Sequence, residues 1–205
     1  NLKKDEKNYS PLMKAIASSL PNDIIYRLID HGADLTYRSP EGLSALYLAC
    51  LGKNEDIVRY LLEHGVDANR SLYQGKYPIH LAAGSDNPKI VQMILDNGGD
   101  VNVCDNLGRP PIFSALICKK NIDTILKLLL DHGADPNAIP TKNQASVLAA
   151  IISTPNQTPS YIKAVQILLE YGADLNFITP QKMTVYQMAK IVAKPPIMKV
   201  IDDFI

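Results

Sequence analysis

The chain has 205 residues, 46% of them hydrophobic, and its 21 basic residues balance its 21 acidic residues. Because a neutral chain has no net field to attract DNA, RNA or an anionic membrane surface, purely electrostatic binding to these partners is excluded. No apolar run approaches the roughly 20 residues that a membrane-spanning helix needs, and no signal peptide is visible.

The first predicted helix begins at Pro11, which follows a serine that can cap the helix. A second helix is expected over about residues 23–31. Its apolar stripe is formed by Ile24, Ile25, Leu28 and Ile29. Gly32 then adopts the left-handed conformation that ends many helices. The start of the chain therefore predicts two helices, a glycine stop and a polar exit.

This pattern recurs along the whole chain. The helix-ending glycines are 33, 33, 35 and 39 residues apart, and they are Gly32, Gly65, Gly98, Gly133 and Gly172. A tetrad opens the first helix of each unit. The second residues of these tetrads are Pro11, Ala45, Pro78, Pro111, Val147 and Val185. Self-similarity at a nearly fixed period indicates a stack of repeated structural units.

A tight turn with positive φ is predicted three residues before the tetrad residue in the central units, at Gly42, Gly75 and Gly108. Asn8, Gln144 and Lys182 replace this glycine in the other units. Extra length collects between the two helices of a unit, at residues 118–121 and 153–160. The second stretch contains two prolines, which we expect to exclude it from either helix.

The last unit is predicted to have a helix from Thr184 to about Val192, followed by two prolines. We interpret the residues after them as a second helix, with an apolar stripe formed by Val200, Ile201, Phe204 and Ile205. A stopping glycine does not follow this stripe, and the chain starts at Asn1 without an initiator methionine. We therefore expect a fragment of a longer protein.

Two stretches carry a resemblance to a known family. They are Tyr77-Pro78-Ile79-His80-Leu81-Ala82-Ala83 and Gly133-Ala134-Asp135-Pro136-Asn137. They resemble the ankyrin repeat, a unit of about 33 residues with a T-P-L-H-x-A signature. The resemblance covers nearly all of the chain. It implies an all-α ankyrin-repeat solenoid of about six helix-turn-helix repeats joined by β-hairpin-like loops, each repeat packing only on its neighbours. The expected single domain, residues 1–205, divides into repeats at about 5–38, 39–71, 72–104, 105–138, 139–178 and 179–205.

Three histidines, His31, His64 and His132, each precede a stopping glycine. They could form a metal or proton-relay ladder. Neighbouring helices, however, pack about 8–10 Å apart, whereas zinc–nitrogen bonds are about 2 Å long. We therefore expect exposed histidines that the helix dipole favours. For His80, the tetrad histidine, the resemblance implies a structural role in hydrogen bonds within and between hairpins.

Five aspartates recur once per unit, and they are Asp34, Asp67, Asp100, Asp135 and Asp174. Paired carboxylates can catalyse proton transfer, but a residue repeated with the scaffold is expected to accept backbone hydrogen bonds. No nucleotide-binding, zinc-protease or nucleophile-elbow motif is present. We expect no enzyme activity, no catalytic residue, no cofactor and no metal site within this chain.

The three cysteines, Cys50, Cys104 and Cys118, lack C-x-x-C spacing and are odd in number, which favours a reducing compartment. Cys50 is expected to fill a small buried slot. The localisation we expect is intracellular and cytoplasmic, or the host cytosol if the chain is a bacterial effector.

The resemblance implies that a partner protein or linear peptide binds the concave face formed by the hairpin tips and the first helix of each repeat. The expected partner-binding residues are Tyr73, Leu107, Arg109, Leu43, Lys76, Gln74, Tyr9, Glu41, Asn106 and Ile117. Further positions on this face are Glu6, Lys7, Lys142, Asn143, Leu51, Ser85 and Cys118. Tyrosine and arginine dominate binding hot spots, although single exposed apolar residues are also normal and can cover a neighbouring hairpin. Lys76 and Arg109 beside tyrosines would suit a peptide with acidic and apolar anchors.

Two alternative functions stay open. The chain could be the targeting or regulatory part of a multidomain enzyme or of a secreted bacterial effector, with a catalytic domain beyond its ends. It could also be a structural domain that assembles with copies of itself. The binding-module reading predicts a monomer that binds no nucleic acid and does not insert into a membrane.

Overall fold

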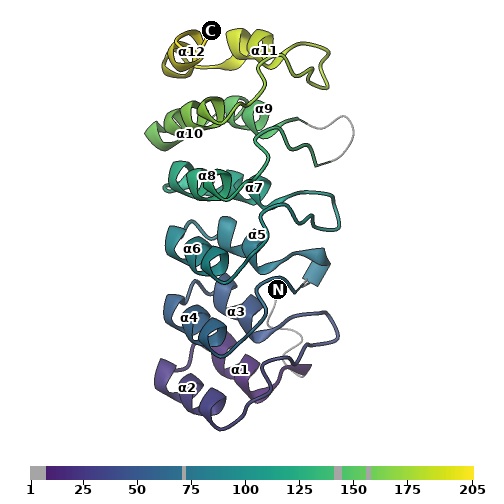
Figure 1. The fold of residues 1–205 in the computed structure, drawn as a ribbon, viewed down its shortest axis with the longest axis vertical. Coiled ribbons are helices and arrows are strands. Elements are labelled where there is room, and N and C mark those ends of the chain that lie inside the picture. Colours follow the sequence, from purple (N-terminus) through teal and green to yellow (C-terminus); the bar gives the residue numbers. More distant parts are fainter. Residues whose placement is uncertain (1–7, 71–72, 141–144, 156–157) are drawn as a thin grey trace.

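The computed structural model describes residues 8–70, 73–140, 145–155 and 158–205. These residues form 12 α-helices and two short 3-10 helices, stacked in pairs along one long axis (Figure 1). In chain order they are α1 (Pro11–Ala17), α2 (Asn22–Asp30), α3 (Ala45–Leu51), α4 (Glu55–Glu63), η3 (Tyr73–Gly75), α5 (Pro78–Ala83), α6 (Pro88–Asp96), α7 (Pro111–Ser114), η4 (Ala115–Ile117), α8 (Ile122–Asp131), α9 (Val147–Ile152), α10 (Pro159–Glu170), α11 (Val185–Val192) and α12 (Pro195–Asp202).

The helices form two layers whose loops project to one side (Figure 1). The odd-numbered helices pack on one another along the stack, and α3 contacts both α1 and α5. The even-numbered helices form the other layer, in which α4 packs on α2 and α6. Each pair therefore contacts the pairs before and after it, as expected for a solenoid. An isolated β-bridge joins Ile178 and Thr184. Within the described residues, no helix is long and apolar enough to cross a membrane.

The predicted start of α1, the glycine stops and the glycine turns are confirmed. Ser10 caps α1 by accepting a hydrogen bond from the Met13 N–H at 3.2 Å, and Pro11 is the first helical residue. The five helix-ending glycines all have positive φ, between 79° and 86° at Gly65 and Gly133 respectively. The turn glycines Gly42, Gly75 and Gly108 also have positive φ. Lys182, which replaces glycine at this turn position, adopts a φ of 61° as well.

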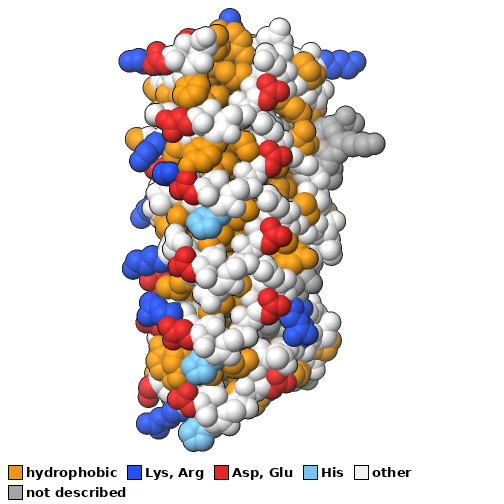
Figure 2. Space-filling model, viewed as in Figure 1, with side chains coloured by type: hydrophobic (Ala, Val, Ile, Leu, Met, Phe, Trp, Pro, Cys, Tyr) orange, Lys and Arg blue, Asp and Glu red, His pale blue; other side chains and the backbone are white. Residues whose placement is uncertain are grey.

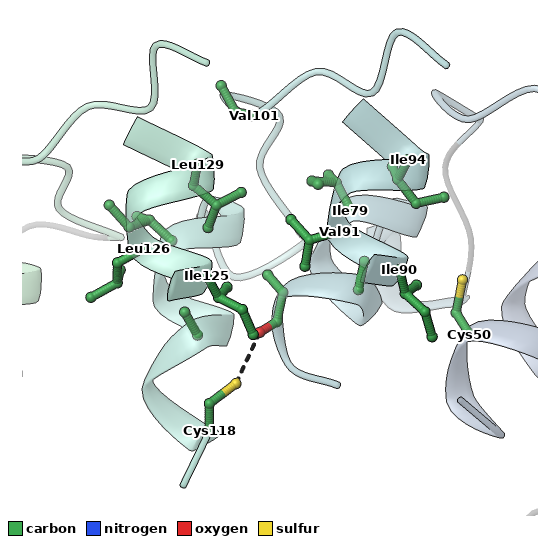
Figure 3. Close-up of a cluster of buried hydrophobic side chains, with 14 of the residues drawn as sticks. Cys50, Ile79, Ile90, Val91, Ile94, Val101, Cys118, Ile125, Leu126 and Leu129 are labelled. Atoms are coloured by element: carbon green, nitrogen blue, oxygen red, sulfur yellow. Dashed lines mark hydrogen bonds between the residues drawn. The ribbon is translucent and has the colours of Figure 1, made fainter. Parts of the chain in front are cut away.

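The core runs along the interior between the two helix layers. Figure 3 shows part of it, where the buried Val91 of α6 lies toward Ile125 of α8 and the buried Ile90 lies on the opposite side of α6, toward Cys50. The Cys118 thiol is also buried and donates a hydrogen bond to the Ala83 carbonyl oxygen at 3.1 Å. Burial of apolar surface contributes about 25 cal/mol per Å². Along this continuous strip it stabilises helix pairs that could not fold alone.

The recurring polar residues belong to the scaffold. Each of the five repeated aspartates accepts a hydrogen bond from the backbone N–H two residues later, as in Asp67 and Asn69 at 2.7 Å. The three repeated histidines are exposed, and their Nδ1–H groups donate to the carbonyl oxygen four residues earlier at 2.7–2.8 Å. Figure 2 shows these histidine and acidic side chains spaced along one face of the stack. The structural interpretation of both sets is confirmed.

Two sequence-based expectations about helix register were wrong. Pro159 begins α10, so the second proline of the 153–160 stretch starts a helix. In the last pair, α12 begins at Pro195 and buries Ile197 and Ile201, whereas Phe204 and Ile205 are 46% and 75% exposed. Prolines favour the first turn of a helix, and this start places Ile197 12 residues after the tetrad residue, as in the second and third pairs.

Candidate functional site

A groove of about 290 Å³ crosses the inner helix layer over α3, α5 and the α7–η4 segment. We call it the inner groove and define it by Leu51, Lys53, Lys76, Gly84, Arg109 and Ile117, which line it. Three of the predicted partner-binding residues, Lys76, Arg109 and Ile117, are among those that line it.

Gly84 lines the groove between two exposed apolar residues. Leu51, Gly84 and Ile117 occupy the same place in three successive pairs, six residues after the tetrad residue. Leu51 and Ile117 are 45% and 70% exposed. A Cβ atom at Gly84 would lie 3.0 Å from the Ile117 Cδ1 atom and 3.4 Å from the Ser114 carbonyl oxygen, so the Ile117 side chain packs closely against this glycine. Two exposed apolar side chains thus line a hollow on either side of a glycine.

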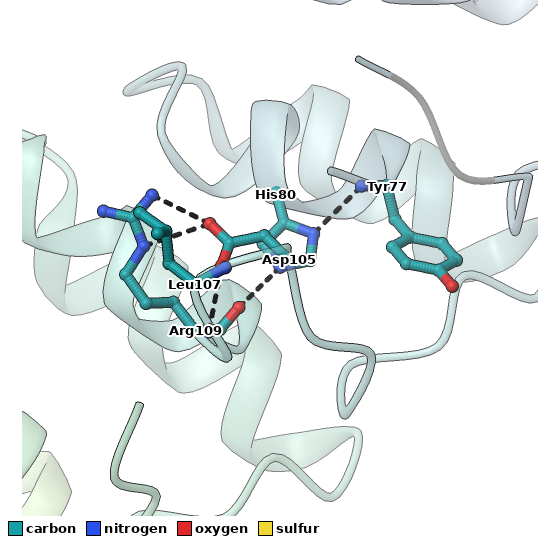
Figure 4. A network of polar contacts seen from close by, with 5 residues as sticks. All are labelled: Tyr77, His80, Asp105, Leu107 and Arg109. Carbon is teal, nitrogen blue, oxygen red and sulfur yellow. Dashed lines mark hydrogen bonds and ion pairs between the residues drawn. The ribbon is translucent and has the colours of Figure 1, made fainter. Parts of the chain in front are cut away.

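His80 of α5 fixes one wall of the groove (Figure 4). Its Nδ1 accepts a hydrogen bond from the Tyr77 N–H at 3.1 Å, so Nε2 carries the proton and donates to the Arg109 carbonyl oxygen at 2.9 Å. Burial lowers the pKa of His80, in agreement with a neutral ring. The expected structural role is confirmed, and this ring ties the third pair to the fourth.

Asp105 holds the hairpin that carries Arg109 (Figure 4). Its carboxylate accepts the N–H groups of Leu107 and Arg109 at 2.8 and 3.0 Å. The Arg109 guanidinium donates to the other oxygen from Nε and Nη2 at 3.0 and 2.8 Å. Burial would raise the pKa of Asp105, but these hydrogen bonds outweigh burial and hold the pKa below its ordinary value. Arg109 is therefore fixed in orientation while it lines the groove.

The lining of the groove is positively charged. Lys53, Lys76 and Arg109 contribute three cations, and the lining contains no aspartate or glutamate. Arg109 is paired with Asp105, but neither lysine forms an ion pair with any residue that the structure describes. Although the chain has no net charge, positive charge is concentrated at this groove.

Asp86 ties the third pair to the fourth beside the same groove. Its carboxylate accepts the backbone N–H groups of Lys119, Lys120 and Asn121 at 3.3, 3.3 and 2.9 Å. Burial would raise the pKa of Asp86, yet these three hydrogen bonds lower it, with a smaller contribution from the charge of Lys53. Of the extra residues predicted at 118–121, the last three therefore donate their backbone N–H groups to the Asp86 carboxylate.

Six of the predicted binding residues line one of two hollows on the surface. Ile117, Lys76 and Arg109 line the inner groove. Gln74, Asn106 and Leu107 line a second hollow of about 210 Å³ between two hairpin tips, which Arg109 joins to the groove. Tyr73 is exposed at a tip but does not line the groove, and Glu41 is partly buried in the second hairpin. Leu51 and Ser85 of the wider set also line the groove, although Ser85 is buried.

The prediction that Tyr9 and Leu43 lie at the surface is wrong, because these residues are only 5% and 3% exposed. They occupy the same place as Lys76 and Arg109, two residues before the tetrad residue. At this place an apolar side chain is buried, whereas lysine and arginine extend their charged ends outward along the wall. Cys118 is likewise buried. Glu6, Lys7, Lys142 and Asn143 lie outside the described residues.

Two groove residues, Gly84 and Lys53, were missed in the sequence. The signal for Gly84 was present, because aligning the units places it between Leu51 and Ile117. Lys53 has a φ of 56° at the link between α3 and α4, in a conformation shared with Ser19 and Asp86 at the same place. Its side chain reaches the groove from that link.

The groove contains no activated nucleophile. Burial raises the pKa of the Cys50 thiol to about 12, and burial also raises that of Cys118 to about 11. Neither thiol is a thiolate at neutral pH, which is the form that attacks substrates or binds metals. Among the described residues, no three histidine, cysteine or acidic side chains are grouped so as to hold a metal ion.

Comparison with known proteins agrees with this geometry. The family profile described as ankyrin repeats (3 copies) matches residues 1–72 and 79–179. The fold is similar to the crystal structure of an ankyrin repeat domain from Acinetobacter baumannii AYE, with a TM-score of 0.82 and 23% sequence identity. The match covers 95% of this chain and 97% of that chain. At this identity the likeness concerns the fold alone. No curated protein sequence matches the chain significantly.

Proposed function

This chain belongs to the ankyrin repeat family, whose members generally act as protein–protein interaction modules, and we propose that it binds a partner protein or peptide in the inner groove. The observation that carries the proposal is the pair of exposed apolar side chains, Leu51 and Ile117, that line a hollow together with Gly84. Folding alone does not require such side chains at the surface, and a partner that covered them would remove apolar area from water.

The frame around the groove favours binding without rearrangement. The His80 ring and the Asp86 carboxylate both join the third pair to the fourth, so the two walls are held at a fixed separation. A preformed groove loses little conformational entropy when a partner binds. We also propose that the chain is a cytoplasmic monomer and that its repeats have the limits given above.

The test uses two isoleucines at the same repeat position. Ile117 and Ile191 are 70% and 71% exposed, and both lie six residues after a tetrad residue. Ile117 lines the inner groove, but Ile191 of α11 does not. Ile117→Asp should therefore weaken partner binding at least tenfold, about 1.4 kcal/mol, whereas Ile191→Asp should leave it unchanged.

A random-peptide display library provides the probe, and the affinity of the selected peptides is measured by calorimetry for each variant. Thermal unfolding followed by circular dichroism checks that both variants are folded. If the two substitutions weaken binding equally, or if neither does, the inner groove is not the binding site. A mass that rises with concentration in light scattering would instead support self-assembly.

A further inference from the structure

The three cations of the inner groove are not equivalent. Arg109 already donates two hydrogen bonds to Asp105, although a guanidinium has five N–H donors and retains others. Lys53 lies close enough to Asp86 to lower the pKa of its carboxyl group. Lys76 is half-buried and forms no ion pair with any described residue, and the ring beside it, His80, is neutral. Lys76 is thus the cation whose charge is least compensated.

Lys76 and the apolar part of the groove lie at opposite ends of α5. Lys76 and Tyr77 precede this helix, and Gly84 follows its last residue. A helix of six residues spans about 9 Å. An extended peptide advances about 3.3 Å per residue, so about three residues of a bound peptide would reach from the Lys76 edge to the hollow at Gly84.

From this placement we propose that the inner groove selects an extended peptide with an acidic side chain and a bulky apolar side chain about three residues apart. The acidic side chain pairs with Lys76 and the free donors of Arg109. The apolar side chain fills the hollow over Gly84, in contact with Leu51 and Ile117. This inference rests on the proposed function and adds the chemistry of the partner to it.

The acidic group is a side chain within the peptide and not a terminal carboxylate. Arg109 lines both the inner groove and the second hollow, which continues past it along Gln74, Asn106 and Leu107. The bound chain therefore has room to continue beyond the Lys76 edge. The absence of acidic lining residues also means that a basic peptide would meet three like-charged side chains, of which Lys76 is the least compensated, and this disfavours it.

The first arm of the experiment is the sequence of peptides selected from a random 12-residue library on the wild-type protein. We expect aspartate or glutamate about three positions from leucine, isoleucine or phenylalanine. Selected peptides without an acidic residue, but whose binding is weakened by Ile117→Asp, would overturn this inference and leave the proposed function standing. Peptides whose binding ignores Ile117→Asp would overturn both.

The second arm reverses the charge at the groove. Lys76→Glu should weaken binding of a selected acidic peptide at least tenfold, and Lys76→Gln should weaken it less. Replacing the peptide's acidic residue with lysine should restore binding to Lys76→Glu. Lys199→Glu is the control, because Lys199 is an exposed lysine on α12 and does not line the groove.

Two results of this arm would overturn the inference. The first is binding that is equally insensitive to Lys76→Glu and Lys199→Glu. The second is binding that disappears when the peptide's C-terminal carboxylate is amidated, since the anion would then be the peptide terminus. Thermal unfolding of each variant distinguishes a lost contact from a lost fold.

Discussion

Ile117 and Ile191 have the same residue type, the same repeat position and nearly the same exposure, yet only the surroundings of Ile117 form part of the inner groove. In the pair before Ile117 the equivalent residue is Gly84, which leaves a hollow. In the pair before Ile191 it is Ser153, whose hydroxyl donates to the Ala149 carbonyl oxygen and lies 3.6 Å from the Met188 sulfur. Both isoleucines are exposed at this repeat position, and the neighbouring repeats decide whether such a side chain lines the groove.

The two regions also differ in how tightly consecutive pairs are joined. Beside the groove, Asp86 accepts three backbone N–H groups from the following pair. At the same place in the pair before Ile191 the chain has Pro155, whose side chain cannot accept hydrogen bonds from N–H groups. Substitutions that remove the features peculiar to the groove region should therefore reduce the difference between the two regions.

The largest effect on stability is expected from Asp86→Ala. It should lower the free energy of unfolding by about 2–3 kcal/mol, because three backbone donors lose a charged acceptor and alanine is strained at the positive φ of residue 86. Urea unfolding provides the measurement. Asp86→Asn is the matched control, since it retains an oxygen acceptor and tolerates this conformation, and it should cost less. Equal losses for both variants would contradict the hydrogen-bonding role.

The contribution of Asp86 should also depend on pH. Its folded-state pKa lies below the ordinary value of about 3.9. The ionised carboxylate therefore stabilises the fold fully above about pH 4, and this stabilisation is lost as the pH falls through the folded-state pKa. The difference in unfolding free energy between wild type and Asp86→Asn should shrink in that range. A difference that stays constant down to about pH 2 would show that the charge is not involved.

A smaller effect is expected at the turn glycines. Gly75→Ala places a Cβ atom 2.0 Å from the Asn106 Oδ1 atom and 2.9 Å from its backbone nitrogen, at a φ of +68°. Because the backbone atom cannot move away freely, we expect a loss of about 2 kcal/mol in urea unfolding. Lys182 occupies the same place in the last pair with a φ of 61°. Lys182→Gly, the control, should change stability by less than about 1 kcal/mol in either direction.

The periodic features of the fold could be predicted from the sequence because each depends on a few neighbouring residues. Gly65 ends α4 with positive φ, and Ser10 caps α1. Prediction failed where the outcome depends on packing between pairs. Leu43 is buried and Lys76 is half-exposed at one repeat position, since the hairpin wall buries a short apolar side chain and lets a long charged one reach solvent.

The sequence predicted the location of the candidate groove better than the residues that line it. Ile117, Lys76 and Arg109 were identified from their exposed repeat positions. Gly84 was overlooked because its contribution is an absence of side-chain atoms, which matters only when Leu51 and Ile117, 33 residues away on either side, are brought next to it. Such a hollow is a property of three repeats together and cannot be assigned to any single one.

The central claim, that a partner occupies the inner groove, is tested most directly by nuclear magnetic resonance of isoleucine Cδ1 methyl groups. A peptide selected by display is titrated into the wild-type protein while the signals of Ile117 and Ile191 are followed. We expect the Ile117 signal to shift with peptide concentration and the Ile191 signal to stay in place. Binding that shifts Ile191, or that leaves Ile117 unperturbed, would contradict the claim.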